Sequence, residues 1–135
     1  RPFNYTGVGQ ELRYLIPKIV NHFKARAPHI ELGNTDVARD FSDVRDVARA
    51  YRLLAEAQPL GETFNLCSGE ATALETCIKV ASEITGHNIE VKVNPGFVRA
   101  NDVKTLCGSS EKLDSVTGRE RHYAIRDTLE WMLQH

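Results

Sequence analysis

The 135-residue chain has no charge excess of either sign, because 17 Lys and Arg oppose 18 Asp and Glu and leave a formal net charge of -1 at pH 7. Such a balance provides no broad field that would attract nucleic acid or an anionic membrane. The sequence also has no signal-peptide pattern and no apolar run of membrane-spanning length. We therefore expect a cytoplasmic protein whose partners are neither nucleic acids nor membranes.

Cysteine is scarce, and histidine is scattered. Cys67, Cys77 and Cys107 are an odd number of cysteines without a C-x-x-C pair, so neither a disulfide framework nor a zinc ribbon is indicated. Reduced thiols, as in a cytosolic protein, are the expectation. The five histidines show no H-x-x-H or HExxH spacing, so the sequence predicts no metal site.

Complete catalytic motifs are also missing. Gly7-Val8-Gly9 resembles the start of a G-x-G-x-x-G fingerprint, but Leu12 replaces the third glycine and Pro17 interrupts the helix that should follow. Tyr14 and Lys18 have the Y-x-x-x-K spacing of a dehydrogenase acid–base pair, which requires a regular helix. Because Pro17 falls inside that spacing, we assign no catalytic residue to the chain.

What the chain does contain is an alternation of strand and helix patterns, which indicates an α/β fold within one domain's length. Apolar residues at helical spacing predict helices, and short β-prone runs predict strands. The first helix begins or kinks near Leu15, because Pro17 is tolerated only in a first turn. The expected helices are 15–24, 43–57, 72–85, 110–116 and a last one carrying Ile125, Leu129 and Met132; the expected strands are 30–32, 62–67 and a half-buried 88–93.

The segment 34–47 carries the clearest candidate for ligand binding. Asp43 is predicted to cap a helix, with Asp46, three residues on, as its reciprocal partner in a capping box. Thr72 and Glu75 are predicted to form the capping box of the next helix. Arg39 would then lie just outside a helix N-terminus, where free N–H groups and an arginine fork suit a phosphate. The alternative is a structural ion pair of Arg39 with Asp36 or Asp40.

Five segments in order resemble the C-terminal half of the extended short-chain dehydrogenase/reductases, the NAD-dependent epimerase/dehydratase family that acts on nucleotide sugars. The similarity is greatest to its GDP-4-keto-6-deoxy-mannose reductases and extends over essentially the whole chain. The segments are Arg1-Pro2-Phe3-Asn4-Tyr5-Thr6-Gly7, Leu32-Gly33-Asn34, Arg39-Asp40-Phe41-Ser42-Asp43-Val44-Arg45-Asp46-Val47, Phe64-Asn65-Leu66-Cys67-Ser68-Gly69 and Arg99-Ala100-Asn101-Asp102.

This resemblance implies that 1–135 is a single partial domain, the nucleotide-sugar-binding region of a longer enzyme. The Rossmann half, with its glycine fingerprint and catalytic Tyr-x-x-x-Lys, would precede the R-x-F-N segment and is expected to be missing. Strands of the chain, among them 62–67, would join that missing sheet. The intact parent would use NAD or NADP, whereas this chain alone would bind neither. The implied partners are a nucleotide-diphosphate sugar, the Rossmann half and further copies in a homo-oligomer.

The resemblance also assigns roles by position. Pro2 and Phe3 would border the nicotinamide, and Asn4 the sugar or diphosphate. The remaining assignments place Leu15 and Lys18 along the nucleotide, Leu32 near the base, Arg39 and Arg99 on the diphosphate, and Asp102 on the ribose or its own loop.

Each assignment has a plainer alternative. Phe3, Leu15 and Leu32 are equally suited to a hydrophobic core, Lys18 to a solvated surface and Asn4 to a turn. For the whole chain, the alternative is a non-catalytic binding module that has this fold but serves protein contacts.

Overall fold

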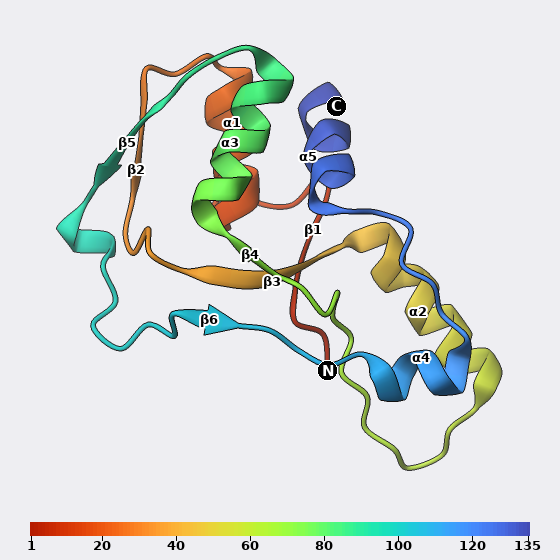
Figure 1. Ribbon diagram of the computed structural model, residues 1–135. Helices are drawn as coiled ribbons and strands as arrows, with labels where there is room; N and C mark the ends of the chain where they lie inside the picture. The colour runs from red at the N-terminus through yellow and green to blue at the C-terminus, as the bar shows by residue number, and fades with distance from the viewer.

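The computed structural model describes all residues from Arg1 to His135 (Figure 1). Its elements follow in chain order: β1 (Asn4–Thr6), α1 (Leu15–Lys24), β2 (His29–Leu32), β3 (Ala38–Asp43), α2 (Val44–Ala57), β4 (Ala71–Ala73), α3 (Leu74–Thr85), β5 (Glu90–Val93), the 3₁₀ turn η1 (Pro95–Phe97), β6 (Thr105–Leu106), α4 (Glu111–Thr117) and α5 (Ile125–Gln134).

Strand β3 is the centre of the main sheet. It pairs in parallel with β1 and β6 and antiparallel with β4. The register places Asn4 beside Phe41, and Arg39 beside both Thr72 and Leu106. A separate two-stranded parallel sheet joins β2 to β5, with Ile30 level with Val91. The α/β fold class is thereby confirmed.

Helices α1, α3 and α5 pack against one another beside the sheet (Figure 1). Their apolar positions recur at helical spacing and enclose most of the larger hydrophobic core, which β2 completes. Phe41 of β3 packs against the same core. The 13 buried members of this cluster are Ile16, Ile19, Val20, Phe23, Ile30, Leu32, Val37, Leu74, Cys77, Val80, Ala81, Leu129 and Met132.

A second, smaller core lies on the other side of β3, between α2, α4 and the segment 64–66. Its five buried members are Val47, Ala50, Phe64, Leu66 and Leu113. In Figure 1, α2 and α4 lie side by side, to the right of and below the three-helix group. The chain therefore encloses two hydrophobic clusters, with β3 between them.

The helix predictions are largely confirmed. α1 begins at Leu15 with Pro17 in its first turn, α2 follows its N-cap Asp43, and Gly86 ends α3 in the left-handed conformation. α4 lies where a short helix was expected, and α5 lies where apolar spacing placed it. These elements carry periodic apolar faces, which is the signal that sequence reading detects best.

Four local predictions are wrong. The expected strand 62–67 contains only a single bridge, between Leu66 and Pro2. Thr72 does not cap α3, since it lies in β4 and α3 begins at Leu74. Asp46 forms no capping box, because its carboxylate accepts hydrogen bonds from the N–H groups of His122 and Tyr123 instead. Strand β5 is present, but all four of its residues are exposed instead of half-buried.

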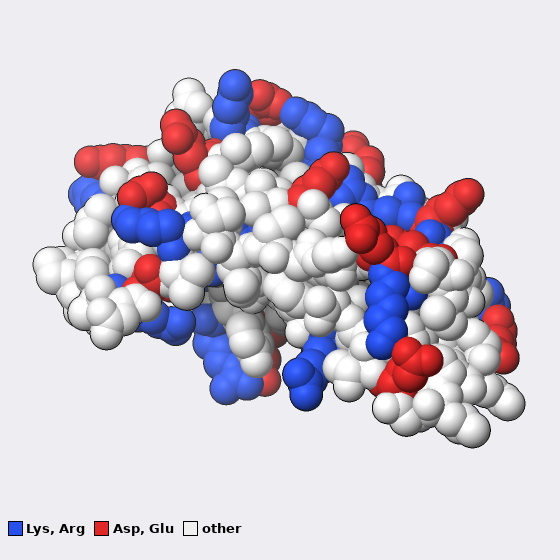
Figure 2. Space-filling view, turned by 60° about the horizontal axis from the view of Figure 1, so that its bottom comes forward, with Lys and Arg blue, Asp and Glu red and all other residues white.

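The surface shows mixed charges. In the view of Figure 2, Lys and Arg side chains are interspersed with Asp and Glu, and the net charge is -1. Among the helices of the structure, none is both long and apolar enough to cross a membrane.

Candidate functional site

Arg39 is held in a fixed position on β3. One of its Nη2 hydrogens is donated to Asp102 Oδ1 at 2.6 Å, and Nη1 donates to the carbonyl oxygens of Ala38 (2.9 Å) and Lys104 (3.4 Å). The side chains of this ion pair are only 17% and 19% exposed. Because β6 pairs with β3 directly after the loop that carries Asp102, the two residues meet although they are 63 positions apart.

The predicted place of Arg39 beside a helix start is wrong. Arg39 lies within β3, and the start of α2 is occupied by Asp43 and Arg45, whose backbone N–H, Nε and Nη2 all donate to the Asp43 carboxylate. The alternative ion pairs are wrong as well. Asp36 binds Lys104 Nζ at 2.5 Å, and Asp40 accepts backbone hydrogen bonds.

The loop that carries Arg99 is fixed by Gly33 and Asn34. The Asn34 side chain accepts from the N–H of Arg99 at 2.8 Å and donates to its carbonyl oxygen at 3.0 Å. A β-carbon on Gly33 would lie 2.1 Å from the carbonyl oxygen of Phe97, so only glycine permits this approach. The end of β2 therefore positions the loop from η1 to β6, at the same end of the molecule as β6 itself (Figure 1).

Lys18 and Leu32 lie along the side of this loop. Lys18 Nζ donates to the carbonyl oxygen of Glu31 at 2.6 Å and lies 4.8 Å from the centre of the Phe97 ring. Leu32 is only 4% exposed and belongs to the larger core, and Leu15 packs against that core while half-buried. The core alternative is thus favoured for Leu32, whereas Lys18 is anchored beside an exposed aromatic ring.

Pro2, Phe3 and Asn4 lie at the N-terminal end of β1. The Phe3 N–H donates to the carbonyl oxygen of Leu66 at 2.9 Å, and Leu66 N–H donates to Arg1 at 3.0 Å, which makes a short parallel ribbon. Asn4 Nδ2 donates to the carbonyl oxygen of Asp40 at 3.4 Å. These residues thus border the segment 64–66, and β3 connects them to Arg39.

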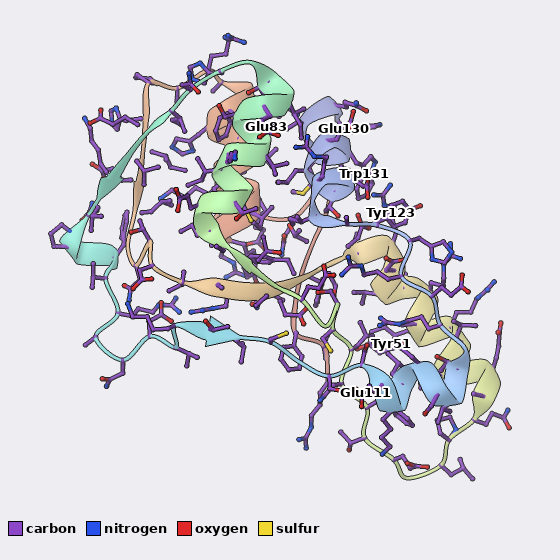
Figure 3. All side chains as sticks on the ribbon, in the orientation of Figure 1. Tyr51, Glu83, Glu111, Tyr123, Glu130 and Trp131 are labelled. Atoms are coloured by element: carbon purple, nitrogen blue, oxygen red, sulfur yellow. The ribbon has the colours of Figure 1, made fainter.

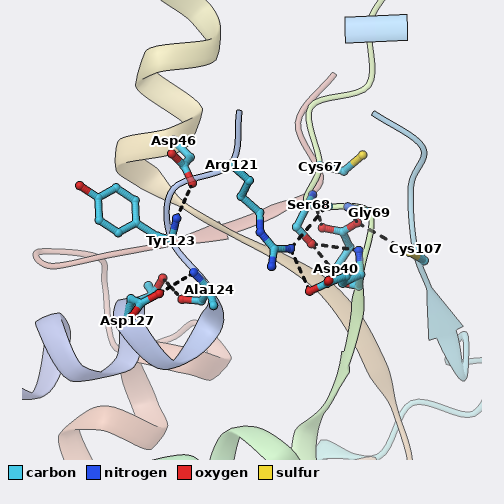
Figure 4. A network of polar contacts seen from close by, with 12 residues as sticks. Asp40, Asp46, Cys67, Ser68, Gly69, Cys107, Arg121, Tyr123, Ala124 and Asp127 are labelled. Carbon is cyan, nitrogen blue, oxygen red and sulfur yellow. Dashed lines mark hydrogen bonds and ion pairs between the residues drawn. The ribbon is translucent and has the colours of Figure 1, made fainter. Parts of the chain in front are cut away.

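Sequence reading missed the role of Asp40. This fully buried carboxylate accepts hydrogen bonds from the N–H groups of Ser68 (2.7 Å), Gly69 (3.0 Å) and Gly108 (3.3 Å). Cys107 Sγ lies 3.9 Å from it (Figure 4). Asp40 therefore ties the turn after Leu66 to the turn after β6. Its partners are 28 to 68 positions away, and no local spacing could have indicated them.

Arg45 joins the start of α2 to α5. Its guanidinium lies 3.7 Å from the ring centre of Tyr123, which directly precedes α5, and 4.0 Å from that of Trp131 within α5; Figure 3 labels both residues. Burial acts to raise the pKa of Asp43, but hydrogen bonds from Arg45 and Thr128 outweigh it and hold that pKa below its ordinary value of 3.8. The hydrogen bonds to Asp43 in turn raise the pKa of Arg45, so this cluster stays fully charged at neutral pH.

The incomplete motifs serve structural purposes. A β-carbon on Gly7 would lie 2.4 Å from Val44 Cγ1, so the absence of a side chain at Gly7 permits close packing against α2. The Tyr14 hydroxyl accepts from Arg13, while Lys18 is turned toward β2. Burial raises the pKa of Cys67, and that of Cys77 to about 12, so both thiols remain protonated at neutral pH.

The chain is similar to known proteins over its whole length. The family model described as GDP-mannose 4,6 dehydratase matches residues 1–132. Two curated relatives are the GDP-6-deoxy-D-talose 4-dehydrogenase of Aggregatibacter actinomycetemcomitans, 37% identical over 137 residues, and the GDP-6-deoxy-D-mannose reductase of Pseudomonas aeruginosa, 30% identical over 138 residues. They cover 100% and 98% of this chain, which in turn spans only 46% and 45% of their own length, in their C-terminal part.

Solved structures agree with this finding. A putative epimerase from Burkholderia cenocepacia is 52% identical with a TM-score of 0.96, and the match covers 99% of this chain and 44% of that one. The structure of RMD from Pseudomonas aeruginosa complexed with NADPH is 29% identical with a TM-score of 0.92, covering 99% and 46%. The resemblance identified in the sequence is confirmed, and the chain belongs to the GDP-mannose 4,6 dehydratase family of nucleotide-sugar epimerases, dehydratases and reductases.

Proposed function

We propose that this chain is the nucleotide-sugar-binding part of an NAD(P)-dependent oxidoreductase whose substrate is a GDP-linked 6-deoxyhexose. Both curated relatives named above act on GDP-6-deoxy sugars according to their names, and both match nearly the whole chain. Hydride would pass between NAD or NADP and the sugar at a cleft between this part and a Rossmann half. The protein provides orientation and electrostatics in such enzymes, while the nicotinamide carries the hydride.

The pre-oriented guanidinium of Arg39 is the observation that carries this proposal. Three of its N–H groups are used by Ala38, Lys104 and Asp102, which leaves Nε–H and one Nη2 hydrogen without a partner in the chain. An arginine with free donors in a fixed plane suits the oxygens of a diphosphate. Arg99, on the loop held by Asn34, would bring a second guanidinium to the same ligand.

The remaining assignments are carried over from the family resemblance. Lys18 beside the Phe97 ring would lie along the nucleotide with Leu15, and Leu32 would support the base from the core. Asp102 would orient Arg39 and reach the ribose. Asn4 would lie near the sugar or diphosphate, with Pro2 and Phe3 at the nicotinamide. Energy from binding the remote diphosphate would then orient the sugar for hydride transfer.

We further propose that residues 1–135 form one partial domain. The smaller core around Phe64 and Leu66, together with the ribbon of Arg1–Phe3, would extend the sheet of the Rossmann half. The larger core between α1, α3 and α5 would belong to the substrate side. With no complete glycine fingerprint of its own, the chain alone would bind no NAD(P).

Calorimetric titration with GDP tests the proposal in the longest natural chain that carries these residues. Arg39→Ala should raise the dissociation constant about 10- to 100-fold, since losing a charged hydrogen bond costs about 1.5–3 kcal/mol. Arg39→Lys should recover only part of the loss, because lysine lacks the planar fork. The matched control is Arg52→Ala, which removes an exposed arginine paired with Glu56 on α2.

The affinity for NAD(P) should be nearly the same in all three variants. An unchanged dissociation constant for GDP in Arg39→Ala would mean that Arg39 only holds the loop of Asp102, and the proposed diphosphate site would have to be abandoned.

A further inference from the structure

Strand β5 has an uncovered edge. It pairs only with β2, and all four of its residues are exposed, with Val91 at 37% and Val93 at 58%. In Figure 1 it forms the left margin of the molecule, on the opposite side from α2 and α4. An exposed strand edge offers a row of unpaired N–H and C=O groups to another strand.

The pairing with β2 decides which groups point outward. Glu90 N–H donates to Pro28 at 3.0 Å, and Asn94 N–H donates to Leu32 at 2.8 Å, so these N–H groups face β2. Backbone groups alternate in direction along a strand. The N–H and C=O groups of Val91 and Val93 therefore point away from β2, toward solvent.

We propose that β5 pairs with β5 of a second copy of this chain, antiparallel, with the two Val91 residues opposite each other. In this register the outward groups of Val91 face their own counterparts and can exchange both hydrogen bonds. Val93 lies opposite Ile89, so one face of the pair is apolar throughout. On the other face lie Glu90 and Lys92, an exposed pair 3.4 Å apart within the strand. In the dimer, each also lies opposite the other residue of the second copy, as oppositely charged cross-strand neighbours.

Charge and hydrogen-bonding capacity select this register over its neighbours. A two-fold axis at Val93 would set Val91 opposite Pro95, which has no N–H to donate. A two-fold axis at Lys92 would set Lys92 opposite itself, and one at Glu90 would set Glu90 opposite itself; like charges directly opposite are destabilising. An axis between two residues would bring outward groups against groups already bonded to β2. Since the strand is complementary to itself in charge, polarity and hydrogen-bond direction, the partner it fits is a second copy.

Charge exchange tests the pairing by sedimentation velocity, again in the longest natural chain that carries these residues. Glu90→Lys alone and Lys92→Glu alone should each raise the dimer dissociation constant about tenfold or more, because two attractive pairs become repulsive. The double variant Glu90→Lys/Lys92→Glu should return the dimer dissociation constant to that of the unaltered protein, because both cross-strand pairs are again oppositely charged. An equimolar mixture of the two single variants should also associate, since one then carries only lysines and the other only glutamates.

The control exchanges an exposed ion pair elsewhere, Arg52→Glu/Glu56→Arg on α2, and should leave association unchanged. Thermal unfolding of each variant checks the strand itself, because Lys92 is level with Glu31 of β2. Loss of association in the double variant, or no effect of Glu90→Lys, would overturn the proposal.

A cross-link provides a second test that does not depend on charge. Paired Cα atoms about 5.5 Å apart fall within disulfide range. In a Cys107→Ser background, which removes the exposed thiol, oxidation should link Val91→Cys into a covalent dimer. Val93→Cys should not link, because its counterpart would lie four positions away along the partner strand. Equal cross-linking of both variants, or of neither, would contradict the proposed register.

Discussion

Asp43 and Asp46 stand at the same helix start but hold different parts of the chain. Asp43 accepts hydrogen bonds from Arg45 and from Thr128 of α5. Asp46 accepts from the N–H groups of His122 and Tyr123, and Figure 4 shows its contact with Tyr123. Both carboxylates are buried, so each satisfies donors that would otherwise be costly to leave unpaired. Together they fix the first turn of α2 against the segment that leads into α5.

Replacing Asp43 should make the protein less stable and less sensitive to acid. At neutral pH, Asp43→Asn should lower the free energy of unfolding by about 1–3 kcal/mol, since Arg45 and Thr128 lose a charged acceptor. The folded-state pKa of Asp43 lies below its unfolded value of 3.8. Its stabilisation is therefore complete above about pH 4–5 and is lost as the pH falls through the folded pKa. The difference in free energy of unfolding between the unaltered protein and Asp43→Asn should accordingly decrease below about pH 4.

Urea unfolding followed by circular dichroism across this range measures the difference. The matched control is Asp127→Asn on α5, whose exposed carboxylate accepts from Ala124 N–H at 2.8 Å. This variant should lower the free energy of unfolding by less than Asp43→Asn does. A difference in free energy of unfolding that stays constant from neutral to acidic pH would show that the charge of Asp43 does not stabilise the helix start.

At the scale of elements, the loop from η1 to β6 depends on the end of β2. Gly33→Ala would place a methyl group 2.1 Å from the carbonyl oxygen of Phe97, which belongs to the backbone and cannot turn aside. The loop must then move away, and Arg99 with it. We expect about a tenfold weaker affinity for GDP, with an overpacking cost of about 1–3 kcal/mol in stability.

Calorimetry with GDP and thermal unfolding measure these two effects separately. The control is Gly96→Ala in η1, beside Phe97, where the new methyl group meets only the side-chain oxygen of Asn94, at 3.2 Å. If both variants bind GDP as the unaltered protein does, the position of the loop is irrelevant to the nucleotide.

The elements divide into those that a sequence reveals and those that it does not. α1, α2, α3 and α5 were predictable because each carries an apolar face at helical spacing. β3 was not, since its buried positions include Asp40 and Ser42, which break the apolar alternation of a core strand. The polar group of Asp40 is tolerated because three backbone N–H groups satisfy it.

The candidate site shows the same limit. The sequence singled out Arg39, Arg99 and Asp102 through a resemblance, whereas spacing alone gave Arg39 the wrong neighbours. The ion pair of Arg39 with Asp102 forms because β6 returns to the edge of β3, and this return is a property of the topology. Local patterns contain no information about contacts between residues 63 positions apart.

On the scale of the whole molecule, the two hydrophobic cores differ in size. Thirteen buried residues join α1, α3 and α5 to β2, whereas only five lie between α2, α4 and the segment 64–66. The smaller cluster is bounded by a ribbon of two short segments, Arg1–Phe3 and 64–66, that is held by three backbone hydrogen bonds. A two-stranded ribbon with so small a core is marginal in water.

These features lead to a prediction for the 135 residues on their own. The ribbon should pair with other copies through its free edges, so light scattering should show self-association that rises with concentration. The self-association should persist in Glu90→Lys, because that substitution weakens only the pairing proposed for the edge of β5. A fluorescence titration with NAD(P)H should show no saturable binding, because Gly7 packs against Val44 and no complete glycine fingerprint is present. A monomer that binds NAD(P) at micromolar concentration would instead make Gly7-Val8-Gly9 a working phosphate loop.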